Sequence, residues 1–393
     1  PSIGLSAILT SMFNAPDWLT YLKVRGSYTE VGNSYGRFMT TVTYPYDEQT
    51  QSWTSTSSYP NTKLKPERTK SWEVGLDARI LNDISLNLTY YRSNTYNQTF
   101  YADLSLSSGY SNIPIQSGNI MNEGLEMSLG YNKQWKDFSF NTNYTLTWNK
   151  NRVKRLADGV YNYATGQPIQ MPELSPLTYG HTDARLILRV GGSMGDVYGQ
   201  RLLKRDLNGY ILNEEGVGLA MENKETYLGS ILPKMNMGWS LGFGYKGVNL
   251  GMTFTGRFGG IVISETQSVL DAAGVSKVSA DVRDAGGVQI NQSKVSAQTY
   301  YQTIQGTAAY YTYSATNVRL GELSLSYTLP KKWFDNKVGM TVGLVGKNLW
   351  MIYCKAPFDP ELTTSAASNF YQGFDAYMLP STRNFGFNVK FQF

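Results

Sequence analysis

Cysteine and histidine are almost absent from this chain. One Cys, Cys354, and one His, His181, among 393 residues leave no material for a disulfide framework, a His/Cys metal cluster or a catalytic set that requires histidine. No phosphate-binding glycine loop and no paired-carboxylate motif stands out in their place. We therefore predict that the chain is not an enzyme and that it binds no metal ion and no cofactor.

Long apolar runs are missing as well. No stretch of about 18 apolar residues occurs, and the mean hydropathy is −0.33, which argues against membrane helices. The net charge of +5 is diluted over the whole length, and no Lys/Arg-rich run of roughly five to eight residues suggests nucleic-acid binding. Neither the search for apolar runs nor the mean hydropathy detects a membrane barrel, because only every second residue of its strands faces lipid.

Aromatic residues, in contrast, are abundant. They make up 13% of the chain, more than a soluble core needs, and they suit the two interfacial girdles of a barrel. In the segment from Arg383 to Phe393, apolar side chains alternate with small or polar ones, as in a strand with one apolar and one wet face. A strand of about 9–11 residues can cross a bilayer. This ending resembles the closing strand of bacterial outer-membrane barrels.

The same alternation recurs in five hairpins with short connections. The predicted strand pairs are 2–13 with 19–31, 72–78 with 84–90, 125–131 with 138–148, 239–245 with 248–254, and 323–329 with 338–344. The segment from Ser2 to Phe13 alternates poorly and could be half a helix if judged alone, but its context favours a strand. At Gly321-Glu322 the apolar positions change phase, which predicts a β-bulge or, alternatively, the end of a loop.

Long connections separate the hairpins. They cover roughly residues 33–69, 98–121, 150–235, 260–316 and 352–381 and are rich in Ser, Thr, Gly, Asn and Tyr. Loops of this length are normally functional or disordered. Short turns at one rim and long loops at the other are typical of outer-membrane proteins, with the turns periplasmic and the loops extracellular. The sequence therefore predicts an all-β fold in which residues 1–393 form about eleven strands of an antiparallel transmembrane β-barrel.

The predicted strand number is odd, whereas single-chain bacterial barrels have an even number of strands. If the closing strand runs toward the periplasm, the first of eleven antiparallel strands runs toward the periplasm as well. An earlier segment must then have brought the chain to the extracellular side. We therefore expect the chain to be the carboxy-terminal part of a larger barrel. A split, a processed or a partial chain would give the same pattern.

Seven motifs carry a family resemblance. Residues 61–75, NTKLKPERTKSWEVG, resemble a segment common in TonB-dependent outer-membrane transporters. Others are similar to the SusC/RagA branch found in Bacteroidetes: SGNIMNEGLEMSLGY (117–131), GDVYG (195–199), LGSILPKMNMGWS (228–240), TNVRLGELSLSYTLP (316–330), GKNLW (346–350) and FDPE (358–361). They occur in the expected order over most of the chain.

The resemblance implies a fold and a function. The complete barrel of that family has about 22 strands around an amino-terminal plug, so this chain would be the second half, without the plug and the first half. The implied function is active import of a bulky nutrient, a glycan or a peptide, across the bacterial outer membrane. The implied partners are outer-membrane lipid, TonB through a part not in this chain, and a SusD-like surface lipoprotein that forms a lid.

Two other function classes share the strand pattern. A passive porin would have the same strands and girdles around an open lumen, but it would not need the SusC-like loop motifs. A soluble all-β adhesin would also alternate, but it would expose no continuous aromatic belt.

Aromatic side chains on the long loops are the candidate residues for substrate or partner binding. Rigid rings offer contact area at low entropic cost, although packing of one loop against another is the alternative role for each of them. The candidates are Trp53, Tyr59, Tyr101, Tyr110, Tyr301, Tyr310, Tyr311, Tyr313, Phe358, Phe370, Tyr371, Phe374 and Tyr377.

Charged residues at inward-facing strand positions form a second candidate set. They are Glu73, Asp77, Arg79, Glu126 and Arg319. The interior of a barrel is polar, so charges are tolerated there, and we expect most of them to be paired across the barrel wall or with the plug. Two loop motifs have structural interpretations: Lys65-Pro66-Glu67 as a strand entry, and Asn208-Gly209 as a hairpin turn rather than part of a calcium loop.

Overall fold

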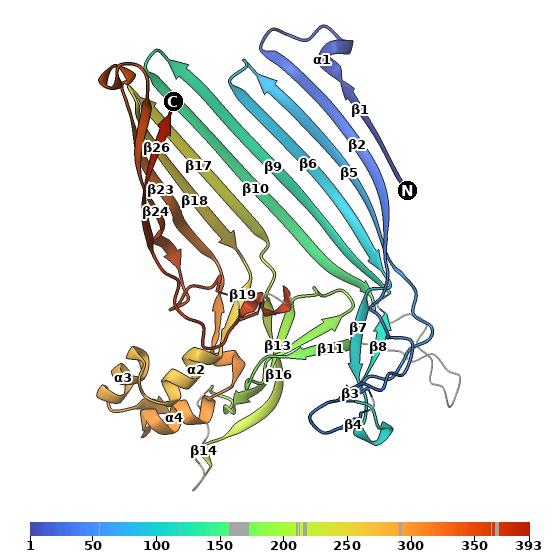
Figure 1. The fold of residues 1–393 in the computed structure, drawn as a ribbon. Helices are drawn as coiled ribbons and strands as arrows, with labels where there is room; N and C mark the ends of the chain where they lie inside the picture. Colours follow the sequence, from blue (N-terminus) through green and yellow to red (C-terminus); the bar gives the residue numbers. More distant parts are fainter. Residues whose placement is uncertain are drawn as a thin grey trace.

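The computed structural model describes residues 1–54, 56–116, 118–156, 173–209, 211, 213–214, 218–290, 293–362, 364–365 and 369–393. Its main element is an eleven-stranded antiparallel sheet that curves into a tall open wall (Figure 1). Every strand pairs with the next strand of the wall along the chain. The strands are β1 (Ser2–Ile8), β2 (Leu19–Asn33), β5 (Glu67–Ile80), β6 (Ile84–Tyr96), β9 (Asn119–Trp135), β10 (Phe138–Arg155), β17 (Met235–Tyr245), β18 (Val248–Phe258), β23 (Asn317–Leu329), β24 (Gly339–Cys354) and β26 (Asn384–Gln392).

All eleven predicted strands are present, and one prediction needs correction. The first strand ends at Ile8, and a single helical turn, α1 (Leu9–Met12), follows it. The assignment of strand to the whole segment up to Phe13 is therefore wrong beyond Ile8. The apolar residues Leu9, Met12 and Phe13 do not alternate with polar ones, which is why the pattern was weak there.

The short turns and the phase change have the predicted character. Lys246 and Gly247 alone join β17 to β18, with φ of 46° and 87°, as two-residue hairpins require. Along β23, Glu322 is opposite Thr253 and Leu320 is opposite Phe254, so Gly321 is the extra residue of a β-bulge. The strand continues through this point, which excludes a loop end at Gly321.

The register of the wall separates two faces. One continuous row of cross-strand partners is wholly apolar: Phe140, Phe243, Leu250, Leu325, Leu344 and Phe387. A row of the opposite face is polar: Asn143, Ser240, Thr253, Glu322, Lys347 and Asn384. Leu344 and Phe387 are 64% and 81% exposed, so no described part of the chain covers them. An uncovered apolar face of this extent suits contact with lipid.

The long connections lie together at one end of the wall (Figure 1). One small sheet contains β11 (Glu173–Thr178), β12 (Arg185–Arg189), β13 (Asp196–Leu203) and β16 (Met221–Ser230), and another contains β22 (Thr312–Ser314), β19 (Ile261–Ser264) and β25 (Phe374–Asp375). The remaining strands form pairs: β3 (Tyr46–Asp47) with β4 (Ser52–Trp53), β7 (Thr99–Asp103) with β8 (Asn112–Gln116), β14 (Asn213–Glu214) with β15 (Gly218–Leu219), and β20 (Val288–Ile290) with β21 (Ser293–Val295). We refer to all five connections as the loop layer.

Three helices of the loop layer follow one another in the connection between β18 and β23. They are α2 (Glu265–Ala272), α3 (Lys277–Asp284) and α4 (Ala297–Ile304), and each has a serine N-cap, at Ser264, Ser276 and Ser296. Short 3₁₀ turns occur at η1 (Leu106–Ser108), η2 (Ala308–Tyr310), η3 (Lys331–Phe334) and η4 (Asn369–Gly373). Among the described residues, no helix is both long enough and apolar enough to span a membrane.

Most of the buried residues belong to the loop layer rather than to the wall. Three apolar clusters fill it: one around Leu188, which also includes Val153 at the end of wall strand β10, one around Leu186 and Ile263, and one around Tyr311 and Ile304. The sequence patterns did not predict these cores, because no single connection has a regular apolar period. Each cluster combines residues from several connections.

Candidate functional site

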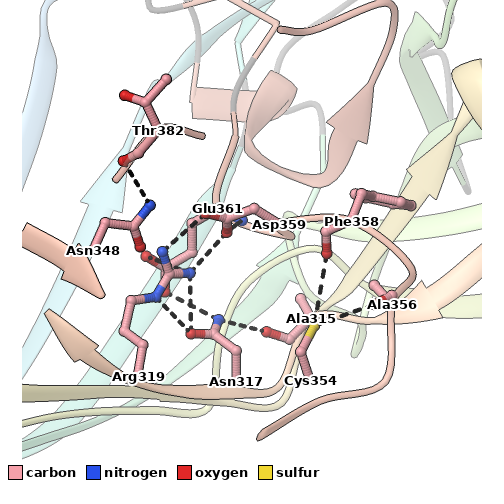
Figure 2. A network of polar contacts seen from close by, with 10 residues as sticks. All are labelled: Ala315, Asn317, Arg319, Asn348, Cys354, Ala356, Phe358, Asp359, Glu361 and Thr382. Atoms are coloured by element: carbon pink, nitrogen blue, oxygen red, sulfur yellow. Dashed lines mark hydrogen bonds and ion pairs between the residues drawn. The ribbon is translucent and has the colours of Figure 1, made fainter. Parts of the chain in front are cut away.

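The best-defined polar site lies where the wall meets the loop layer, and its centre is Arg319 near the start of β23 (Figure 2). The Arg319 guanidinium donates two parallel hydrogen bonds to Asp359, from Nη1 to Oδ2 at 2.9 Å and from Nη2 to Oδ1 at 2.7 Å. Its Nη2 also lies 3.4 Å from Oε2 of Glu361. The side chains of Arg319 and Asp359 are 11% and 8% exposed, so the pair is largely withdrawn from water.

Asn317 completes this network from the same strand. Its Oδ1 accepts hydrogen bonds from Nε and Nη2 of Arg319 at 3.3 and 3.2 Å, and its Nδ2 donates to Oε1 of Glu361 at 3.1 Å. The Nδ2 group also donates to the carbonyl of Ala315. Asn317 is fully buried, and both its oxygen and its nitrogen are satisfied. The four polar side chains thus form one connected unit, which we call the latch.

The latch holds the connection between β24 and β26 against the neighbouring strand β23. Burial alone would raise the pKa of Asp359, but the hydrogen bonds and the charge of Arg319 outweigh it, and the net shift is downward. Asp359 therefore stays ionised at neutral pH. Two motifs that were separate in the sequence, TNVRLGE and FDPE, meet in this contact. The sequence did not predict that Arg319 pairs with a carboxylate of a loop, although Arg319 and Asp359 both lie in motifs that carry the family resemblance.

The other four predicted inward charges lie on the polar face of the wall. Asp77 lies 3.8 Å from Nζ of Lys23 and accepts a hydrogen bond from Asn87. The guanidinium of Arg79 lies over the ring of Tyr21, 5.7 Å from its centre. Glu73 and Glu126 have no ion-pair partner among the residues that the structure describes. That this polar face lines a lumen stays a prediction.

Between β6 and β18 two rows of the polar face carry only amide, hydroxyl and glycine positions. One row runs through Ser85, Gly130, Asn143, Ser240 and Thr253, and the next through Asn87, Ser128, Thr145, Gly238 and Thr255. Within it, Ser128 Oγ donates to Oδ1 of Asn143 at 3.0 Å. Such a surface offers many neutral hydrogen-bonding groups and few fixed charges.

The loop aromatics divide into exposed and packed rings. Trp53, Tyr101 and Tyr377 are exposed, and Trp53 contacts the ring of Tyr46 with 5.1 Å between the ring centres. Tyr59 and Tyr110 meet edge to face at 5.1 Å. Among the described residues, no ring contact joins Trp53, Tyr101 and Tyr377 to one another. Whether any of them contacts a ligand stays a prediction.

The remaining rings have packing contacts inside the loop layer. Tyr301, Tyr311 and Phe374 are buried, and Phe370 is half-buried. Phe358 packs edge to face on Tyr313, with 5.6 Å between the ring centres, and Tyr371 packs on Tyr179 at 6.2 Å. The hydroxyl of Tyr310 accepts a hydrogen bond from the backbone of Leu203 at 3.1 Å. These contacts correspond to the alternative, structural role.

The structure describes both loop motifs that have a structural interpretation from the sequence. Strand β5 begins at Glu67, immediately after Pro66, and Asn208-Gly209 lie in a turn closed by the antiparallel bridge between Arg205 and Ile211. Within the described part of the chain, no three His, Cys, Asp or Glu side chains are arranged to hold a metal ion.

Comparison with known proteins agrees with this architecture. Residues 1–349 match the family model described as TonB dependent receptor-like, beta-barrel. The chain is 26% identical to TonB-dependent receptor P3 of Formosa agariphila over 410 residues, which cover 95% of this chain and 40% of that protein. It is 27% identical to TonB-dependent receptor SusC of Bacteroides thetaiotaomicron over 154 residues, 38% of this chain and 14% of that protein.

Solved structures show the same fold. The structure titled RagAB peptide importer in the open-open state has a TM-score of 0.69 at 19% identity, covering 99% of this chain and 42% of that one. The closed-closed state gives 0.64 at 20% identity, with 90% and 40% coverage. The chain thus spans about 40% of the length of the relatives that it matches over most of its own length. Its wall and its matches show that the chain belongs to the β-barrel domain of the TonB-dependent receptor family, an outer-membrane family of transporters, and that it is similar to SusC and to the RagAB structures.

Proposed function

We propose that the complete protein imports a bulky nutrient, a glycan or a peptide, across the outer membrane with energy supplied through TonB. The observation that carries this proposal is the match of residues 1–349 to the family barrel, together with a wall that is apolar on one face and amide- and hydroxyl-rich on the other. A neutral polar face suits the passage of a ligand with many hydrogen-bonding groups, because few fixed charges would hold it in place.

The proposed import route runs along the length of the wall, from the loop layer to the short turns. The loop layer faces the cell exterior and the short turns face the periplasm, as in other outer-membrane barrels. The edge strands β1 and β26 pair, in the complete protein, with strands that this chain does not contain, and a barrel of about 22 strands results. The roughly 40% coverage of the relatives supports this arrangement.

A SusD-like lipoprotein lid over the loop layer is the proposed partner outside the cell. The resemblance of the loop motifs to the SusC/RagA type supports it, and so does the compact form of the loop layer, whose three buried clusters give it a firm surface. Co-purification of the complete protein from detergent-solubilised outer membranes, followed by identification of bound lipoproteins, tests this partnership.

Uptake measurements test the function itself. Cells that carry the complete protein should take up labelled nutrient at a rate that falls to background when the proton gradient is collapsed or when TonB is deleted. Nutrients differ in class, so an oligosaccharide mixture and a peptide mixture are assayed separately. Uptake that is indifferent to the gradient, together with a steady large conductance of the purified protein in a planar bilayer, would instead identify a passive porin.

A further inference from the structure

A cavity of 480 Å³ lies between the three helices α2, α3 and α4 of the loop layer. These helices lie in the loop layer, beyond the ends of the wall strands (Figure 1). The innermost residues of the cavity are Asp271, Ser279 and Tyr301, which are 5%, 2% and 6% exposed. Exposed polar side chains surround them: Arg283, Gln298 and Gln302. A concave site in which a few polar groups converge is a candidate binding site.

The carboxylate of Asp271 is the unusual feature of this cavity. One of its oxygens, Oδ1, accepts a hydrogen bond from Nε2 of Gln267 at 2.7 Å, and the other accepts none from the residues that the structure describes. The carboxylate also forms no ion pair within them. A buried carboxylate that lacks a cation is less stable than one that is paired. The site therefore offers a strong gain to a cation that enters the cavity.

Three phenols lie close enough to sense the same charge; Tyr301 and Tyr311 are buried, and Tyr313 is half-buried. Burial first, and the negative charge of Asp271 second, raise the pKa of Tyr313 to about 12. The pKa of Tyr301 and the pKa of Tyr311 are raised by the same two causes. Since these groups are neutral at physiological pH, they do not compensate the carboxylate. The hydroxyl of Tyr301 has no hydrogen-bond partner among the described residues and is therefore available to a ligand.

We propose that this cavity binds a protonated primary amine, with the ammonium group on Asp271 and Tyr301 and adjacent ligand oxygens on Arg283, Gln298 and Gln302. Carboxylate and phenol oxygens accept from an ammonium group, and guanidinium and amide N–H groups donate to carbonyl or hydroxyl oxygens. Peptide amino-termini and amino sugars both present this combination. That the bound amine is cargo for import rests on the proposed function; the binding itself does not.

Calorimetric titration of the complete protein in detergent tests the site with four probes. Tetraglycine and a glucosamine tetramer carry free amines, and N-acetyl-tetraglycine and an N-acetylglucosamine tetramer are their blocked counterparts. The free amine of at least one pair should bind, and acetylation of its amine should weaken binding at least ~10-fold. Binding by tetraglycine alone identifies the ligand as a peptide, and binding by the glucosamine tetramer alone identifies it as an amino sugar.

Asp271→Asn removes the charge at nearly constant volume and should weaken amine binding to the level of the blocked probe. Asp281→Asn is the matched control, because Asp281 lies on α3 with an exposed side chain paired to Lys277 and should leave binding unchanged. Equal binding of free and blocked probes, an unaffected Asp271→Asn variant, or no binding by any probe at millimolar concentration would overturn the inference. The comparison of free with blocked probes needs no variant, so a folding defect in Asp271→Asn does not remove the test. Amine binding without gradient-dependent uptake would contradict the import function alone.

Discussion

The wall and the loop layer are stabilised in different ways. In the wall, strand-to-strand hydrogen bonds hold eleven strands together while apolar rings such as Phe387 remain uncovered. In the loop layer, side chains such as Leu186, Leu188 and Ile263 are fully enclosed by other parts of the chain. The wall therefore depends on an apolar surrounding, whereas the loop layer carries its own core and is suited to water.

The largest expected effect concerns the latch that joins the two regions. Arg319→Met removes the guanidinium and leaves Asp359 buried without its cation, which should cost about 3–5 kcal/mol of stability. Limited proteolysis of the connection 355–383 and the free energy of unfolding in lipid vesicles both report the loss.

Lys347→Met is the control for this experiment. Lys347 lies 3.6 Å from Glu322 on the polar face, but both side chains are well exposed, so the loss should be about 0–1 kcal/mol. Similar losses for the two variants would show that the latch is no stronger than a surface ion pair.

A core truncation tests whether the loop layer is stabilised by its own interior. Leu188→Ala opens a cavity next to Val153 and should destabilise the loop layer by about 2–5 kcal/mol. Val190→Ala, just after the same strand β12, changes an exposed side chain and should stay within about 0.5 kcal/mol. Hydrogen exchange of β11 to β13 measures both, and indifference to Leu188→Ala would refute a packed core.

Arginine substitutions on β18 test the two faces of the wall. Leu250→Arg places a charge on the apolar face and should cost about 2–4 kcal/mol if the position is near mid-membrane. Thr253→Arg, on the opposite face of the same strand, should fold with a smaller loss. Refolding into lipid vesicles compares them, and equal losses would mean that the assignment of the faces is wrong.

Acid should have the smallest effect over the ordinary pH range. The pKa of Asp359 is lower in the folded protein than its usual value of 3.8, so the stabilisation from the latch is complete above that pH and is lost as the pH falls through the lowered value. Proteolysis of the connection 355–383 should therefore be constant between about pH 5 and 8 and increase only below about pH 4. An increase already near pH 6 would contradict an Arg319-stabilised carboxylate.

The two regions also differ in how far sequence predicts them. Strand periodicity is local, so the order of side chains predicted the opposite facing of Leu250 and Thr253, and at Gly321 it predicted either the bulge that is present or the end of a loop. The helices α2 to α4 did not, because each spans only eight residues and shows too few turns for a helical period to stand out.

The latch illustrates a second limit. Arg319 and Asp359 are 40 residues apart, and their contact depends on how the connection after β24 folds back over β23. The sequence identified Arg319 as an inward charge that needed a partner, but pairing between distant side chains leaves no periodic trace. The Asp271 cavity was missed for the same reason, since three separate helices have to meet before it exists.

The short parallel pairing of β19 with β25 has a mechanical consequence. Ile263 and Ser264 pair with Phe374 and Asp375, and the buried hydroxyl of Ser264 donates to Asp375 at 2.6 Å. The connection between β18 and β23 and the connection between β24 and β26 are thus joined in one small sheet. Arg319 holds the second of these connections against the wall. A force applied to either connection is shared by both. A partner that presses on this small sheet would therefore move it as one rigid unit rather than bend a single connection.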